Sequence, residues 1–237
     1  MTLLLKKLTT TVIVFFSINS YAVPVTFTNS TAFSTAIGAY TATTQDFESS
    51  TAGNVVTNGG TLGGITFNYN ALASLGVSMQ IRDDFSANSG NNYLGTDDLD
   101  GLFQGGDGFS INFSSANAIG MFFISGDELF DEDIALTVNN TSGTTVSLLS
   151  SLPELTLSDG SFVHFLGVVD DMNTFSSAAV SSPGCGSTPG CFFYNVDDIT
   201  TAATPSSNQV PAPPVIALLL VGLIPMLRNN KVKIFAL

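Results

Sequence analysis

The feature that most constrains the fold is a series of short apolar segments, separated by Gly, Asn and Ser clusters, with no crossover helix between them. Phe109, Ile111 and Phe113 alternate with polar residues, which places three large side chains on one face of a strand. Residues 118–124 are apolar throughout, as in a central strand. Short strands without long crossovers predict an all-β protein, an antiparallel β-sandwich of jelly-roll type.

The remaining apolar segments complete about a dozen expected strands. They cover residues 23–28, 43–48, 61–69, 77–82, 93–94, 134–138, 144–149, 162–169, 174–180 and 191–199. One short N-terminal helix is expected, capped by Asn29 or Ser30, because Phe33, Ile37 and Tyr40 recur at near-helical spacing.

Both ends of the chain have the composition of targeting segments. Lys6 and Lys7 precede an apolar block, and Ser20-Tyr21-Ala22 offers small residues before a cut, so residues 1–22 are predicted to be a signal peptide cleaved after Ala22. The sandwich is expected over residues 23–199, followed by a Thr/Pro/Ser linker over 200–209. Residues 210–237 then give a proline-rich start, an apolar helix at about 212–227 and a basic tail, which predicts a transmembrane helix in the inner membrane.

The C-terminal order Val210-Pro211-Ala212-Pro213, apolar helix and basic end from Arg228 resembles the PEP-CTERM sorting signal, the ice-binding protein C-terminal motif family. The resemblance implies export in a Gram-negative bacterium, processing by an exosortase-like membrane enzyme, and delivery to the cell envelope or the extracellular polysaccharide. Ala212 replaces the glutamate of the family name, and the basic cluster is sparse. An uncut membrane anchor is the alternative.

Three short motifs in the exported part also resemble extracellular domains that precede such tails. They are Asp46-Phe47-Glu48, Phe165-Leu166-Gly167-Val168 and Asn195-Val196-Asp197-Asp198-Ile199. Those domains are lectin-like or galactose-binding-like jelly rolls. The resemblance raises the expectation for the fold more than for the function.

The exported part is strongly acidic. All nineteen acidic residues lie between Asp46 and Asp198, and Arg82 is the one basic residue outside the targeting segments, which leaves a net charge of −18. This charge opposes binding to nucleic acid and to anionic lipid. Metal ions are natural counter-ions for it, although such a charge also serves simply to keep a secreted protein soluble.

Calcium is the metal that these oxygen-rich loops favour, because it takes six to eight oxygen ligands from carboxylates, carbonyls and water. One structural site is predicted where the first and last strands meet, and a second in a later acidic loop; solvated loops without metal are the alternative. The expected ligands are Asp46 or Glu48 with Asp197 or Asp198 at the first site, and Asp97, Asp98, Asp100 and Asp107 at the second.

Asn-rich loops beside aromatic residues suit the recognition of sugar hydroxyls, where a ring face covers the sugar and amides fix its orientation. The candidate ligand-binding residues are Tyr69, Asn70, Asn91, Asn92 and Tyr93. If the protein is a carbohydrate-binding module, polysaccharide is therefore its expected ligand.

The two cysteines and the single histidine support few kinds of site. Cys185 and Cys191 flank a five-residue turn, which predicts a disulfide worth about 2 kcal/mol in an oxidising compartment; a metal pair is the less favoured reading. His164 is the single histidine, no Gly-x-Ser-x-Gly elbow accompanies it, and paired carboxylates are too common here to indicate a glycosidase. The sequence thus favours a non-catalytic surface or matrix protein over a carbohydrate-binding module, and either over a hydrolase.

Overall fold

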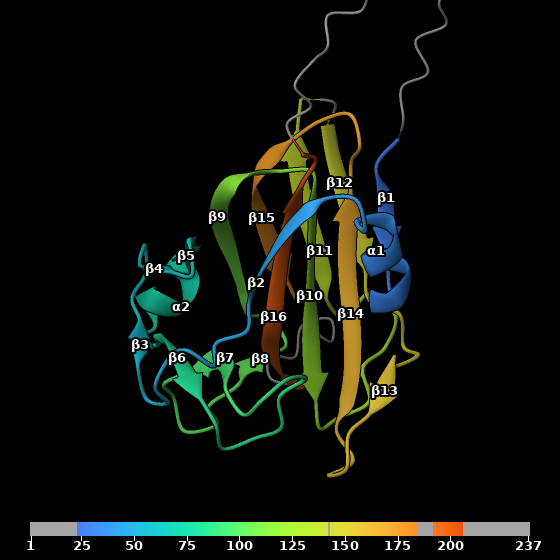
Figure 1. The fold of residues 1–237 in the computed structure, drawn as a ribbon. Helices are drawn as coiled ribbons and strands as arrows, with labels where there is room; N and C mark the ends of the chain where they lie inside the picture. Colours follow the sequence, from blue (N-terminus) through green and yellow to red (C-terminus); the bar gives the residue numbers. More distant parts are fainter. Residues whose placement is uncertain (1–22, 142, 184–191, 206–237) are drawn as a thin grey trace, which may run out of the picture.

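The computed structural model describes residues 23–141, 143–183 and 192–205, which form two antiparallel β-sheets packed face to face (Figure 1). The predicted antiparallel sandwich is thereby confirmed. The long strands from β9 (Gly108–Ala116) onward alternate largely between the two sheets, so successive strands cross the ends of the sandwich.

The larger sheet has ten strands in the order β1-β14-β10-β16-β7-β6-β3, with β13 beside β14 and with β2 and β8 beside β16. Their bounds are β1 Val25–Phe27, β2 Thr41–Gln45, β3 Val55–Val56, β6 Met79–Arg82, β7 Tyr93–Thr96, β8 Phe103–Gln104, β10 Ala118–Ser125, β13 Leu155–Thr156, β14 Phe162–Val169 and β16 Phe193–Ala203.

The smaller sheet has six strands in the order β12-β11-β15-β9-β5-β4. Their bounds are β4 Thr61–Leu62, β5 Ile65–Asn68, β9 Gly108–Ala116, β11 Ala135–Asn140, β12 Gly143–Leu148 and β15 Phe175–Ser181. The hairpin of β11 and β12 is closed by pairing of Asn140 with Gly143, at the turn that the sequence predicts.

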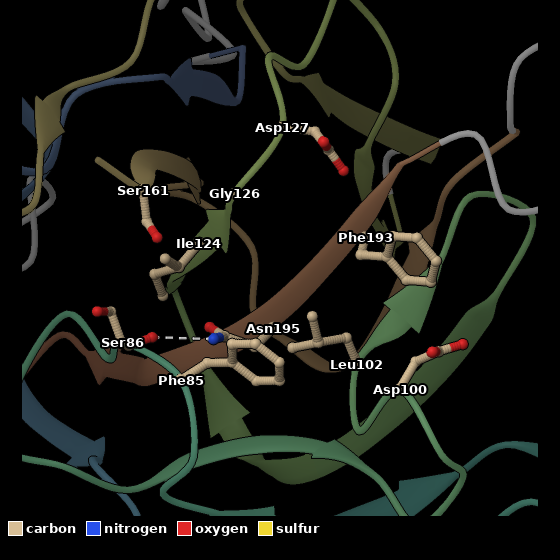
Figure 2. Close-up of a pocket in the computed structure, with 10 residues that line it drawn as sticks. All are labelled: Phe85, Ser86, Asp100, Leu102, Ile124, Gly126, Asp127, Ser161, Phe193 and Asn195. Carbon is tan, nitrogen blue, oxygen red and sulfur yellow. Dashed lines mark hydrogen bonds between the residues drawn. The ribbon is translucent and has the colours of Figure 1, made fainter. Parts of the chain in front are cut away.

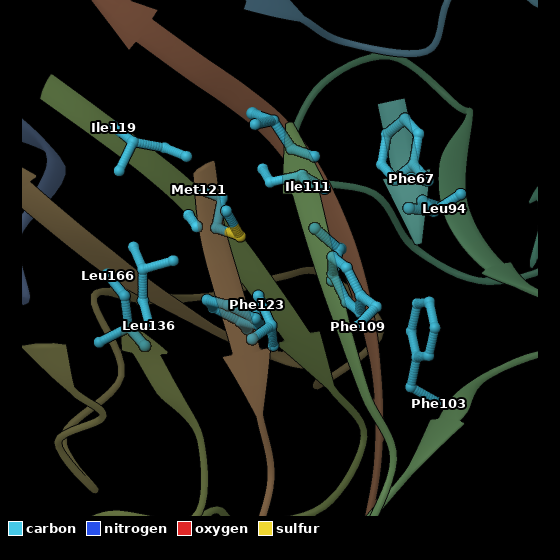
Figure 3. Close-up of a cluster of buried hydrophobic side chains, with 14 of the residues drawn as sticks. Phe67, Leu94, Phe103, Phe109, Ile111, Ile119, Met121, Phe123, Leu136 and Leu166 are labelled. Atoms are coloured by element: carbon cyan, nitrogen blue, oxygen red, sulfur yellow. The ribbon is translucent and has the colours of Figure 1, made fainter. Parts of the chain in front are cut away.

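The main core lies between the sheets and is built by alternation along the strands (Figure 3). Ile119, Met121 and Phe123 of β10 point into it, and Phe109 and Ile111 of β9 meet them from the other sheet. The alternating residues Phe109, Ile111 and Phe113 therefore form part of an inner face of the sandwich. The apolar residues on the other face of β10 must be covered by a different element.

Helix α1, Ser30–Ala36, provides that cover on the outer face of the larger sheet. Asn29 Oδ1 accepts a hydrogen bond from the Ala32 backbone N–H and caps the helix. Phe33 packs over Gly120 and its pairing partner Gly167, where an added Cβ would come within 2.5 Å of the Phe165 ring and 2.7 Å of the Phe33 ring respectively. The two glycines form the slot that the helix occupies.

Two elements differ from the sequence-based expectation. A second helix, α2 (Asn70–Ser74), follows β5, although the sequence predicts only the one N-terminal helix. Strand β16 continues to Ala203, which pairs with Thr41, so the predicted linker of residues 200–209 begins inside a strand. Among the described residues, no helix is long and apolar enough to cross a membrane.

Both ends of the described chain lie at one end of the sandwich, which we call the proximal end (Figure 1). Val25 pairs with Val169, and Ala118 pairs with both Val169 and Ala202 there. At the opposite, distal end, Ile124 of β10 pairs with Asn195 of β16. The distal end is thus remote from both the first and the last described residues of the chain.

Candidate functional site

A pocket of about 280 Å³ lies at the distal end, on the outer face of the larger sheet (Figure 2). Ile124 and Asn195 form its floor, since alternation turns them away from Phe123 and Tyr194 in the core. Apolar side chains make up much of its wall. The lining residues are Phe85, Ser86, Asp100, Leu102, Ile124, Gly126, Asp127, Ser161, Phe193 and Asn195.

The amide of Asn195 is the buried polar group of this pocket. Its Nδ2 donates to the Ser86 carbonyl oxygen at 3.0 Å, which fixes the orientation of the side chain (Figure 2). Its Oδ1 has no hydrogen-bond partner among the described residues, although Asn195 is only 2% exposed. A buried acceptor without a partner costs about 1–3 kcal/mol, so a ligand that donates to Oδ1 would recover that free energy.

Asp159 orients the two serine hydroxyls of the pocket. Ser86 and Ser161 both donate through Oγ to Asp159 Oδ2, at 2.5 and 3.0 Å. These bonds, with Ser86 the largest contributor, lower the pKa of the Asp159 carboxyl. Because each hydroxyl proton is directed to Asp159, both serine oxygens offer lone pairs to a ligand.

Asp197 holds the loop that carries Phe85 and Ser86. Its Oδ2 accepts hydrogen bonds from the backbone N–H groups of Asn88 and Ser89, at 2.9 and 3.0 Å, and its side chain is fully buried. Burial raises the pKa of Asp197 to about 7, although these N–H donors act in the opposite direction. The position of the pocket wall therefore depends on one buried carboxyl group.

Glu48 binds the same loop through its other end. Its Oε1 accepts from the backbone N–H groups of Asn91 and Asn92, at 2.9 and 2.6 Å. The approach is possible because Gly90, at φ +59°, has no side chain: a Cβ there would lie 2.2 Å from the Glu48 carboxyl carbon. Sequence-predicted metal ligands thus serve as anchors for a loop.

The residues of the first predicted calcium set lie near one another, but their carboxylates bind donors of the protein. Gln45 pairs with Ile199, which brings Asp46 and Glu48 to the same region as Asp197 and Asp198. Asp198 accepts from Asn88 Nδ2 and Ser89 Oγ, and Asp46 from the Glu48 N–H, so the carboxylates already have donors. In the described ranges, no three Asp, Glu, His or Cys side chains gather as a metal site.

The second predicted calcium set is dispersed for the same reason. Asp97 accepts from the Ser78 N–H at 2.7 Å, Asp98 from the Gly101 N–H at 3.0 Å, and Asp107 from the Gln104 N–H at 2.7 Å. Asp100 instead lines the distal pocket. Asp98 and Asp107 each stabilise their own turn, whereas Asp97 binds the chain at Ser78, so the four carboxylates have separate partners.

The predicted sugar-binding residues are largely structural. Tyr69 and Tyr93 are 2% and 0% exposed, and their hydroxyls donate to the Val56 carbonyl and to Asp84, so neither ring face can stack on a sugar. Asn70 accepts from Asn58, and Asn92 donates to backbone carbonyls at Phe47 and Ser50. Asn91 is exposed, but it lies outside the distal pocket.

His164 lies beside a second hollow of about 320 Å³, which also includes Glu128, Phe130 and Phe162. Its ring shares a hydrogen bond between Nδ1 and the Ser150 carbonyl oxygen at 3.0 Å, so Nδ1 carries the proton and Nε2 is an acceptor. Burial lowers the pKa of His164. Its Nε2 has no partner within the described chain, so no serine hydroxyl there is activated by this histidine.

Several predicted positions lie outside the described residues. They are the cleavage site at Ala22, the cysteines Cys185 and Cys191, and the sorting-motif residues Val210, Pro211, Ala212, Pro213 and Arg228. The signal peptide, disulfide and C-terminal helix remain predictions.

Apart from Asp100, which belongs to the second predicted calcium set, the residues of the distal pocket are not identified as a site by sequence reasoning. Phe193, Asn195 and Asp197 alternate with Tyr194 and Val196, a pattern that predicts a solvated outer face. The loop that covers this face comes from residues 83–92, about a hundred positions earlier in the chain. No local pattern in β16 encodes that contact.

Comparison with known proteins identifies no family. No protein-family model matches the chain, and no curated protein matches it. Among solved structures, the chain is similar to the K2 cleaved adhesin domain of Lys-gingipain (Kgp), with 13% identity and a TM-score of 0.43, over 68% of this chain and 99% of that one. A likeness this distant assigns neither a family nor a function.

Proposed function

We propose that this chain is an exported, non-catalytic protein of the cell surface or extracellular matrix, whose jelly-roll-type sandwich binds polysaccharide in the distal pocket. The observation that carries the proposal is the buried Oδ1 of Asn195, which lacks a partner among the described residues in a pocket with apolar walls. Sugar sites combine apolar ring contacts with a few fixed polar groups in this way.

The polarity of the lining supports a sugar over a purely apolar ligand. Phe85, Leu102 and Phe193 provide apolar contact, and the Asn195 amide is held in one orientation by Ser86. A sugar hydroxyl that donates to Oδ1 would satisfy it, whereas a hydrocarbon would leave it without a partner. The proposed role therefore combines two predictions from the sequence, a surface component and a carbohydrate-binding module.

Delivery is the second part of the proposal. The predicted signal peptide of residues 1–22 directs export, and the PEP-CTERM-like segment of residues 210–237 is recognised by an exosortase-like enzyme in the inner membrane. The described chain ends at the proximal end, so a protein attached through its C-terminus would present the distal pocket away from the attachment point.

The test is binding of the full chain, extracted in detergent, to an array of bacterial polysaccharides. We expect binding to at least one neutral or amino-sugar polymer, with a loss of about tenfold or more in N195A. F85A, at a half-exposed wall residue, should weaken binding with the fold intact, while N112A, at an exposed residue of β9, should bind as the parent does. Absence of binding to every glycan would refute the proposal.

The non-catalytic part has its own test, because His164 is the one histidine available to a Ser-His hydrolase. We expect no turnover of esterase or glycosidase substrates above a buffer blank. Turnover that H164A abolishes would replace the proposed role with an enzymatic one.

A further inference from the structure

The distal pocket presents hydrogen-bond acceptors almost exclusively. Ser86 and Ser161 direct their hydroxyl protons to Asp159. The Asn195 amide donates to the Ser86 carbonyl, while its buried Oδ1 has no hydrogen-bond partner within the described structure. Asp100 and Asp127 add carboxylate oxygens, which are acceptors when ionised. A ligand that fits must therefore be rich in donors.

The two carboxylates at the rim have little compensation from the protein. The nearest donor to Asp100 is Gln104 Nε2, at 3.4 Å, and among the described residues no side-chain hydrogen bond reaches the Asp127 carboxylate. Figure 2 shows Asp127 and Asp100 on opposite sides of the Phe193 ring. A ligand that rests on this ring would pass between two negative charges.

The one basic side chain of the described residues lies near this rim but is already paired with another carboxylate. Arg82, the single Lys or Arg of residues 23–205, is bound to Asp84, and this pairing lowers the pKa of Asp84 to about 2. The Arg82 guanidinium lies against Gly101, next to Asp100, and the pocket belongs to a domain of net charge −18. This field repels uronic acids and sulfated sugars and attracts cations.

We propose that the distal pocket recognises amino sugars whose amine is free, so that a hexosamine ammonium group is held at the Asp100 and Asp127 rim. The inference rests on the proposed carbohydrate binding and names its ligand class. The ammonium supplies three donors and a positive charge, the ring hydroxyls supply the donor for Asn195 Oδ1, and the apolar ring face covers Phe193.

The experiment compares three oligosaccharides of equal length by isothermal titration of the full chain at pH 6 in low salt. They are a glucosamine oligomer, its fully N-acetylated form, and a galacturonate oligomer. We expect the glucosamine oligomer to bind at least about tenfold more tightly than the acetylated one, the difference to shrink in high salt, and the galacturonate not to bind.

Two double variants test whether Asp100 and Asp127 cause the preference for the free amine. D100N/D127N should remove the preference for the free amine and retain binding of the acetylated oligomer. E132Q/D171N removes two exposed charges outside the pocket and should keep the preference, which separates a local effect from the overall field.

The outcomes distinguish this inference from the proposed function. If acetylated and free-amine oligomers bind equally, or if D100N/D127N keeps the preference, the amine specificity is wrong and the carbohydrate site stands. If none of these oligomers binds and the polysaccharide array is also empty, both are wrong.

Discussion

Carboxylates in this domain bind backbone N–H groups where other proteins would pair them with Lys or Arg. Glu48 Oε1 lies 2.6 Å from the Asn92 nitrogen, and Asp133 Oδ2 lies 2.6 Å from the Phe130 nitrogen. Charge-assisted bonds of this kind are worth more than neutral ones and need no cation. The sequence shows the excess of acidic residues plainly, but the backbone donors are set by loop geometry, so the sequence alone does not reveal these partners.

Asp197 makes the stability of the domain depend on pH. Its pKa is raised to about 7 by burial, against about 3.9 in an unfolded chain, so between these values the folded state binds the extra proton. Stability should therefore fall as pH rises from 5 to 8, by up to about 3 kcal/mol, because about two pH units separate pH 5 from the folded pKa and each is worth about 1.4 kcal/mol.

Urea unfolding of the parent and of D197N from pH 5 to pH 8 measures this effect. Asparagine keeps an acceptor for the loop N–H groups and does not ionise, so the stability of D197N relative to the parent should rise with pH. The lowered pKa of His164 acts in the opposite direction but is common to both proteins, so it cancels in the difference. Parallel pH profiles would contradict the assignment.

At the scale of elements, the sequence predicts the long strands, including those that are apolar on both faces. The expected strand of residues 162–169 coincides with β14, and the apolar block from Ala118 is β10. Helix α2 and the two-residue strands β3, β8 and β13 are not predicted, because segments this short carry no periodicity and depend on their neighbours. The distal pocket is unpredictable for a related reason, since β16 and the loop over it are distant in sequence.

The packing of α1 depends on the paired glycines beneath Phe33. We expect G120V to force the Phe165 ring or the helix outward, at a cost of about 1–3 kcal/mol, which corresponds to a melting temperature lower by roughly 3–10 °C. G126V is the matched control, because a Cβ at Gly126 meets no atom within 4 Å. Equal melting temperatures for the two variants would show that α1 does not occupy this slot tightly.

At the scale of the whole molecule, the ends of the described chain and the distal pocket lie at opposite ends of the sandwich. Val25 and Ala202 lie at the proximal end, while Asn195 lies at the distal end of the same sheet. β16 links the two, since it starts beside the pocket and ends at the exit of the chain. This separation is what a surface protein needs in order to bind a polymer while it is held by its C-terminus.

The intact mass of the protein recovered from the producing cells tests its delivery. We expect the mass of a chain that starts at Val23, lacks the basic tail from Arg228, and is lighter by the two hydrogens of a Cys185–Cys191 disulfide. A mass that retains the tail would favour the uncut anchor. The mass of all 237 residues would contradict export through the signal peptide.

The most direct measurement of the central claim is a crystal structure of the chain grown with the best-binding glycan. The account predicts sugar density between Phe85 and Phe193, with a hydroxyl within hydrogen-bond distance of Asn195 Oδ1. Sugar bound elsewhere on the sandwich, with the distal pocket filled by water, would contradict it.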